Sequence, residues 1–235
     1  LLWSVLNPLL MAIVISIVFQ NFFKFAVPNF AVYYLTGSLI FNFMNEATSS
    51  AMVSIVGNAP LIKKVYIPKY IFPLEKVMFA FVNMLFSMIA LVIMMGVTKL
   101  GIIGSAADLN ISWTIVLFFI PMLYTLVFSL GLGLILAAVN VYFRDVGHLY
   151  SVWTMAWMYL TPIIYPMDIV EGTWVMNVIR LNPMYYFVTY FRDVVTNGTV
   201  PGLKTNLLCM GISLLFLVLG LWVFKKKQDR FILFI

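Results

Sequence analysis

One carboxylate stands well inside the long apolar stretches of this sequence. Glu46 follows Asn42 by four residues and precedes Ser50 by four, so a helix would carry all three side chains on one face. An ionisable group buried in a membrane points by default to function. A carboxyl that packs between helices explains Glu46 equally well. Because no second acid, His or Lys lies at a similar depth to accept a proton, we expect gating or packing and not proton relay.

Two short charged segments could contact a partner protein. Segment 58–64 is basic, is bounded by prolines and is too polar for a bilayer interior. Arg144 and Asp145 stand next to each other in a short polar loop between two apolar stretches. For this pair, a solvated loop at a helix end is the alternative to a docking contact.

Aromatic residues crowd the region from Trp153 to Phe191. A belt of rings at the membrane interface accounts for about half of them. The surplus favours a lined path, because ring faces offer sliding sugars apolar contact without a fixed hydrogen-bond register. The candidates for this path are Tyr165, Trp174, Tyr185, Tyr186 and Tyr190.

Motifs for bond chemistry are missing from the sequence. It contains no G-x-x-x-x-G-K-S/T phosphate loop, no G-x-S-x-G and no H-E-x-x-H. The sequence has one cysteine, Cys209, and one histidine, His148. It therefore cannot form an intrachain disulfide or a metal site built from several cysteines or several histidines. We therefore expect no catalytic residue, metal or cofactor in this chain, and any ATP that it uses must be bound by another chain.

The elements that carry these residues are predicted to be membrane helices. The chain is 64% hydrophobic and 9% charged, and a helix needs about 20 apolar residues to cross a bilayer core. We expect one all-α transmembrane domain over residues 1–235, with a coupling loop at 54–73 and short re-entrant helices at 166–203. A barrel would need alternating segments of about 10 residues, which the sequence lacks. The expected spans are residues 2–22, 30–53, 74–97, 111–139, 149–165 and 205–224.

The basic residues predict the orientation. With both termini on one side, that side carries nine of the 14 basic residues and the other side five. An excess of Lys and Arg marks the cytoplasmic side, so we expect both termini inside and region 166–203 outside. The net charge of +6 reflects this flanking pattern, and we expect no nucleic-acid partner. The nine are Lys63, Lys64, Lys69, Lys76, Arg144, Lys225, Lys226, Lys227 and Arg230; the five are Lys24, Lys99, Arg180, Arg192 and Lys204.

Five segments in order resemble the permeases of type-2 ABC exporters that export polysaccharides. They are residues 2–10, 58–74, 140–146, 161–165 and 181–185. The resemblance implies six spans, a homodimer and two cytoplasmic ATP-binding subunits that hold ATP and Mg²⁺. It also implies a coupling helix before the third span and gate helices between the fifth and the sixth. The family also has an amphipathic N-terminal helix that the given sequence does not match, so we expect the natural protein to carry a further segment before Leu1. The expected contacts with the ATP-binding subunit are Asn58, Leu61, Lys63, Lys64, Arg144 and Asp145.

The function implied by the resemblance is export across a bacterial cell membrane. The substrate would be a polyprenyl-linked glycan such as O-antigen or teichoic acid, moved from the cytoplasm to the outer face in contact with membrane lipid. A permease for drugs or lipids is one alternative, and an ion-coupled transporter using Glu46 is another. A membrane glycosyl- or acyltransferase would need an acid/base pair or a nucleophile near one face, which the sparse acids argue against.

Overall fold

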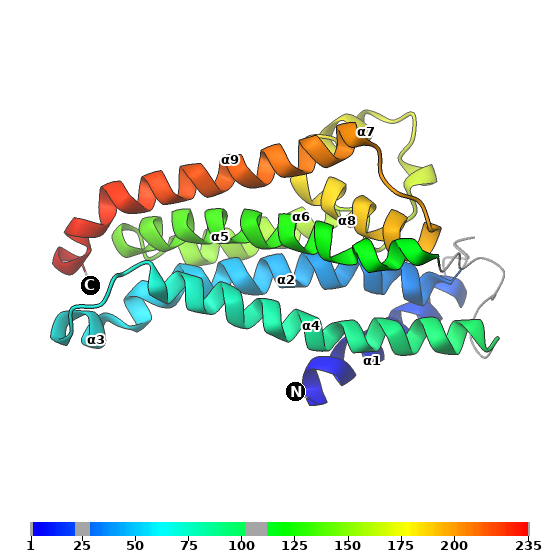
Figure 1. Ribbon diagram of the computed structural model, residues 1–235, viewed down its shortest axis with the longest axis horizontal. Helices are drawn as coiled ribbons and strands as arrows, with labels where there is room; N and C mark the ends of the chain where they lie inside the picture. The colour runs from blue at the N-terminus through cyan, green and yellow to red at the C-terminus, as the bar shows by residue number, and fades with distance from the viewer. Residues whose placement is uncertain (1, 22–28, 102–111, 235) are drawn as a thin grey trace. The chain divides into compact units, whose positions relative to one another are not determined.

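The computed structural model describes residues 2–21, 29–101 and 112–234, and these form helices and turns without any strand (Figure 1). Within these ranges, four helical segments are long and apolar enough to cross a membrane. The expected all-α membrane class is therefore confirmed. The four segments are Leu2–Phe19, Ile71–Lys99, Trp113–Tyr142 and Leu203–Leu233.

The order of the helices along the chain is close to the order that the sequence predicts. Three residues of the expected spans and charge pattern lie outside the described residues: Phe22, Lys24 and Ile111. The longer helices are α1 (Leu2–Asn21), α2 (Phe30–Gly57), α4 (Ile71–Lys99), α5 (Phe119–Tyr142), α6 (Val146–Tyr159) and α9 (Leu203–Lys227). The shorter elements are α3 (Ala59–Lys64), η2 (Trp113–Phe118), η3 (Met167–Ile169), α7 (Trp174–Ile179), α8 (Pro183–Arg192), η4 (Asp193–Asn197) and η5 (Gln228–Leu233).

Two helices explain why only four segments qualify as spans. α2 is 28 residues long but rich in hydroxyl and amide side chains. Its buried hydroxyls bond within the helix: Thr48 Oγ1 donates to the Met44 carbonyl at 2.7 Å, and Ser54 Oγ donates to the Ala51 carbonyl at 2.7 Å. α6 has only 14 residues and ends at Tyr159, ahead of Pro162, which cannot continue a helix. The count of six spans stays a prediction.

The chain divides into two compact units. Unit 1 comprises the described parts of Leu1–Phe41, Asn83–Met122 and Met158–Asn206. Unit 2 comprises Asn42–Val82, Leu123–Trp157 and the described part of Leu207–Ile235. Helices α2, α4, α5, α6 and α9 each contribute residues to both units.

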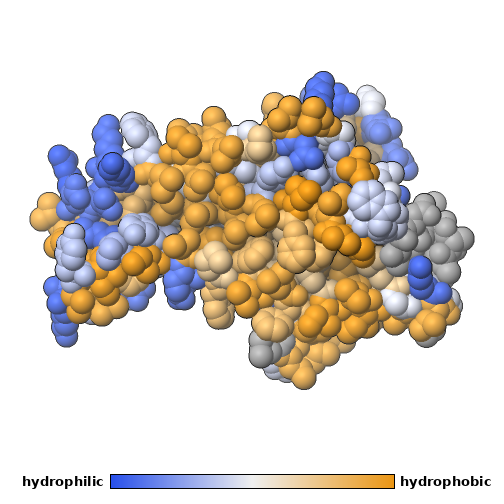
Figure 2. Space-filling view, in the orientation of Figure 1, coloured by the Kyte–Doolittle hydropathy of each residue, from blue (hydrophilic) through white to orange (hydrophobic). Residues whose placement is uncertain are grey.

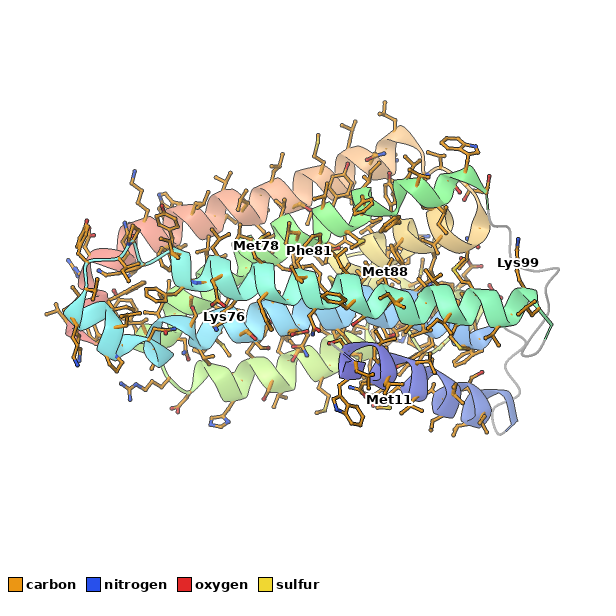
Figure 3. All side chains as sticks on the ribbon, turned by 60° about the horizontal axis from the view of Figure 1, so that its bottom comes forward. Met11, Lys76, Met78, Phe81, Met88 and Lys99 are labelled. Carbon is orange, nitrogen blue, oxygen red and sulfur yellow. The ribbon has the colours of Figure 1, made fainter. Side chains whose placement is uncertain are left out.

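In unit 1, α8 supplies much of the buried core. The side chains of Met184, Phe187, Val188 and Phe191 are inaccessible to solvent. The segment α1 is far more exposed, and it lies beside the part of α4 that carries Met88 (Figure 3). Ser87 Oγ of α4 donates to the carbonyl of Ser4 at 2.9 Å, which attaches the two helices.

In unit 2, α5 and α9 cross with glycine on both sides of the contact. A Cβ added at Gly131 would overlap the backbone of Phe216, and one added at Gly220 would overlap the backbone of Gly131. Small residues permit this close approach between membrane helices. Polar residues of unit 2 gather at the end that carries α3 and η5, whereas the helix surfaces beside them are hydrophobic (Figures 1 and 2).

Candidate functional site

The first candidate surface in unit 2 is the short helix α3 and the turn after it. Asn58 precedes the helix and Pro60 occupies its first turn, where proline needs no backbone donor. The Asn58 side chain donates from Nδ2 to the carbonyl of Ser54 at 2.8 Å, so it attaches α3 to the end of α2. Lys63 and Lys64 lie in the last turn, where positive charge complements the helix dipole.

Burial separates the two faces of α3. Ile62 is the buried residue of this helix, whereas Leu61, Lys63 and Lys64 are exposed. The turn that follows presents Tyr66, whose side chain is 100% exposed. The exposed face therefore combines an apolar and an aromatic group, which suit the core of a protein interface, with two positive charges, which suit an acidic partner surface. The sequence analysis did not select Tyr66, because its exposure depends on where the proline-flanked turn directs the ring.

The loop between α5 and α6 lies toward the same end of unit 2 as α3 (Figures 1 and 3). Arg144 and Asp145 are both exposed in it. The backbone carbonyl of Asp145 accepts hydrogen bonds from the amides of His148 at 3.1 Å and Leu149 at 3.3 Å, which begins α6. The side chains of this pair thus remain available at the surface, as the docking hypothesis requires.

Glu46 belongs to the unit 2 part of α2 and is half-buried. Along the same face, Asn42 is exposed and Ser50 is half-buried. This polar face therefore differs from the fully buried face that carries Thr48, whose Oγ1 lies 2.6 Å from the hydroxyl of Tyr150. The position of Glu46 suits the expected gating or packing role, which stays a prediction.

The second candidate surface lies in unit 1 and carries the aromatic residues. Trp174 begins α7 and is 76% exposed. Tyr185 and Tyr186 on α8 are half-buried, and their rings meet edge to face at 5.1 Å between centroids. Tyr186 donates from its hydroxyl to the carbonyl of Arg180 at 2.9 Å, which fixes the orientation of its ring. Burial raises the pKa of the Tyr185 phenol above its ordinary value.

The remaining two aromatic candidates are held more firmly. Tyr165 is half-buried, donates to the carbonyl of Tyr159 at 3.0 Å and accepts at its own carbonyl from the hydroxyl of Tyr33 at 2.8 Å. Tyr190 is only 1% exposed, and its hydroxyl accepts from Asn206 Nδ2 at 3.0 Å. In this arrangement Tyr190 packs inside unit 1, so we place it outside the set of rings available to a ligand.

Arg192, at the end of α8, is a buried charged residue whose structural role the sequence analysis did not predict. Its side chain is buried within unit 1, at 7% exposure. It donates from Nη1 to the Pro162 carbonyl at 2.6 Å and from Nη2 to the Tyr33 carbonyl at 3.1 Å. Among the described residues it forms no ion pair with a carboxylate. Its only sequence signal is that it is a basic residue beside an uncharged segment of 11 residues.

No group of His, Cys, Asp and Glu residues that could hold a metal ion occurs in the described part of the chain. The first surface is basic with exposed apolar groups, and the second carries exposed and half-buried aromatic rings. The chain matches the family model described as ABC-2 type transporter over residues 1–196.

Curated relatives align with nearly the whole chain. An O-antigen export system permease protein RfbA from Klebsiella pneumoniae is 29% identical over 232 residues, which is 98% of this chain and 85% of the relative. A protein of the same name from Myxococcus xanthus is 26% identical over 231 residues, with the same coverage of both chains. Membership of this family implies partnership with an ATP-binding subunit. The chain belongs to the ABC-2 type transporter family, as a multi-pass membrane subunit and not as the ATPase.

Proposed function

We propose that this chain is the permease of an ATP-driven exporter that moves a lipid-linked polysaccharide from the cytoplasm to the outer face of a bacterial cell membrane. The observation that carries the proposal is the similarity, over 98% of the chain, to proteins named as O-antigen export permeases. Teichoic acid or a related glycan on a polyprenyl carrier remains within the same substrate class.

The aromatic surface of unit 1 supports a sugar substrate. Trp174 is exposed, and Tyr185 and Tyr186 form a half-exposed pair. Stacking on such rings contributes about 0.5–1.5 kcal/mol each, which is weak enough for a long chain to advance from ring to ring. Tyr165 lies in the same unit and completes the proposed path.

The charged surface of unit 2 supports a mechanical connection to the ATP-binding subunit. We propose that Asn58, through its bond to Ser54, holds α3 in place while Leu61, Lys63 and Lys64 contact the partner. Arg144 and Asp145 add a second contact at the same end of unit 2. In this arrangement two ATP-binding subunits hold ATP and Mg²⁺ and act on a homodimer of this chain.

Export by the reconstituted complex tests the docking surface. Reversing Lys63 and Lys64 to Glu should lower ATP-driven export by about tenfold or more, because like charges would then meet across the interface. The matched control replaces both residues with Arg, which keeps the charge and should keep export. Membrane insertion should be normal in both variants. Normal export with normal coupled ATPase activity in the Glu variant would exclude this surface as the docking site.

A second set of variants tests the sugar path. Replacing Trp174, Tyr185 and Tyr186 together with Ala should slow export by about tenfold or more, from the summed loss of stacking, with assembly and basal ATPase activity intact. Replacement with Phe should be tolerated. The control is Trp113→Ala, which removes another exposed ring of unit 1 outside region 166–203. Normal export by the triple-Ala variant would refute the path, and export that collapses with a protonophore would favour ion coupling.

A further inference from the structure

The segment that follows α9 folds back onto unit 2 and buries an aromatic side chain. Phe231 in η5 has 0% of its surface exposed, whereas Leu233 in the same short helix is 78% exposed. The Phe231 ring packs edge to face with Phe224 at 5.3 Å and with Tyr142 at 6.1 Å between centroids. The segment is therefore anchored by one side chain and is more than a solvated basic tail.

The cluster that receives Phe231 also contains the buried residue of α3. Ile62 lies in this cluster together with Ile55 at the end of α2 and Phe72 at the start of α4. Because Ile62 is the buried residue of α3, the position of α3 depends on the packing of this cluster. A helix of six residues has little stability of its own in water, where helices below about 12 residues are marginal.

Two polar contacts attach the same segment at its start. Lys69, in the turn between α3 and α4, donates from Nζ to the carbonyl of Gln228 at 2.7 Å. Tyr142 at the end of α5 donates from its hydroxyl to the carbonyl of Lys227 at 3.1 Å, and Lys227 Nζ lies 5.4 Å from the centre of the Tyr142 ring. The segment thus contacts the turn that follows α3, through Lys69, and it begins where the end of α9 is bonded to the end of α5.

We propose that η5, anchored by Phe231, is a positioning element for the coupling surface: it holds α3 and the turn through Lys69 at a fixed height and angle for the ATP-binding subunit. This inference rests on the proposed role of α3. Its physical reason is that α3 presents a charged face through one buried side chain, so any force on that face must be resisted by the cluster behind it. Phe231 itself need not touch the partner.

A spin label on α3 tests the positioning directly, without a partner or a substrate. Lys64→Cys places the label on the exposed face, and the native Cys209 is buried. In the full-length chain in lipid nanodiscs, Phe231→Ala should increase the mobility of this label. Phe231→Leu, which keeps an apolar group in the cluster, should restore most of the order, and Leu233→Ala should change nothing. A label equally immobile in the Phe231→Ala and native backgrounds would overturn the proposal.

The functional arm uses the unlabelled chain with its ATP-binding subunit. Phe231→Ala should lower export and substrate-stimulated ATPase activity by about tenfold, a typical size for one lost coupling contact, with both subunits still co-purifying. If Phe231→Ala fails to assemble, the variants Lys69→Met and Lys69→Arg test the proposal instead, because only the Arg variant keeps a donor to the Gln228 carbonyl. Loss of coupling in the Lys69→Met variant alone supports the proposal, and normal coupling in that variant refutes it. Absence of ATP-driven export in the native complex would instead refute the proposed function and leave the label experiment valid.

Discussion

Replacing the buried Arg192 with Met should loosen unit 1 without abolishing its helices. Arg192 joins three parts of the unit: its own helix α8, the start of α2 and the non-helical segment after α6. The bonds reach the Pro162 carbonyl at 2.6 Å, the Tyr33 carbonyl at 3.1 Å and Thr36 Oγ1 at 3.4 Å. The guanidinium carbon also lies 3.7 Å from the centre of the Tyr33 ring.

The size of the effect follows from these contacts. The Pro162 carbonyl and the partly buried Tyr33 carbonyl would lose their charged donor, at about 1–3 kcal/mol for the first and less for the second, which still accepts from Thr36 Oγ1; the third bond is too long to add much. A desolvated cation–π contact adds about 2 kcal/mol. Removing the guanidinium also relieves the cost of burying a charge, which offsets part of this sum. We therefore expect a net loss of about 2–4 kcal/mol in the local stability of unit 1.

Hydrogen exchange of the purified chain measures this loss. In Arg192→Met, amides of α8 and of residues 161–165 should exchange about a hundredfold faster, because opening of this region becomes easier. Arg192→Lys should fail to rescue, since an ammonium cannot reproduce the planar fork of donors. Arg180→Gln is the matched control, because Arg180 is an exposed arginine of the same unit. Equal exchange in Arg192→Met and Arg180→Gln would refute the reasoning.

Three further predictions concern other parts of the chain. Glu46→Gln keeps shape and hydrogen bonding, so ATP-driven export should largely survive; its loss in an intact, ATP-hydrolysing complex would favour proton coupling. Gly131→Leu should lower the unfolding temperature sharply, because the side chain would overlap the α9 backbone, whereas Gly211→Leu has open space and should not. Burial raises the pKa of Asp193, outweighing its hydrogen bond from Asn197. Its stabilising contribution is therefore complete at low pH and lost as pH rises through the folded-state pKa, and Asp193→Asn should remove that dependence in pH-resolved unfolding.

The sequence was sufficient for features that depend on local composition. Long uncharged stretches predict the helices, and the prolines separate segment 58–64 from the neighbouring spans. The family resemblance implies a coupling helix there, and the structure has α3 at Ala59–Lys64. The expected span at 149–165 runs past the end of α6 because apolar character continues beyond Tyr159 while Pro162 ends helical geometry. Amino-acid composition indicates which segments prefer lipid to water, but it does not indicate where the backbone stops being helical.

Features that depend on long-range packing could not be predicted in this way. Tyr190 is as aromatic as Tyr185, but only the fold shows that one is enclosed and bonded to Asn206 while the other is half-exposed. Arg192 is separated by 156 residues from Thr36, to which it donates. Phe231 follows a run of lysines that would suit a solvated tail, and its burial depends on helices far away in the sequence.

The arrangement of ionisable groups favours a mechanical role over a chemical one. Arg192, the buried arginine of unit 1, donates to backbone carbonyls and lies over an aromatic ring, so it organises structure. The charges on α3 and the α5–α6 loop are exposed and suit docking. Glu46 is half-buried on α2. The chain belongs to the ABC-2 type transporter family as the membrane subunit and partners an ATP-binding subunit, so we expect the free energy of ATP to reach it through that partner.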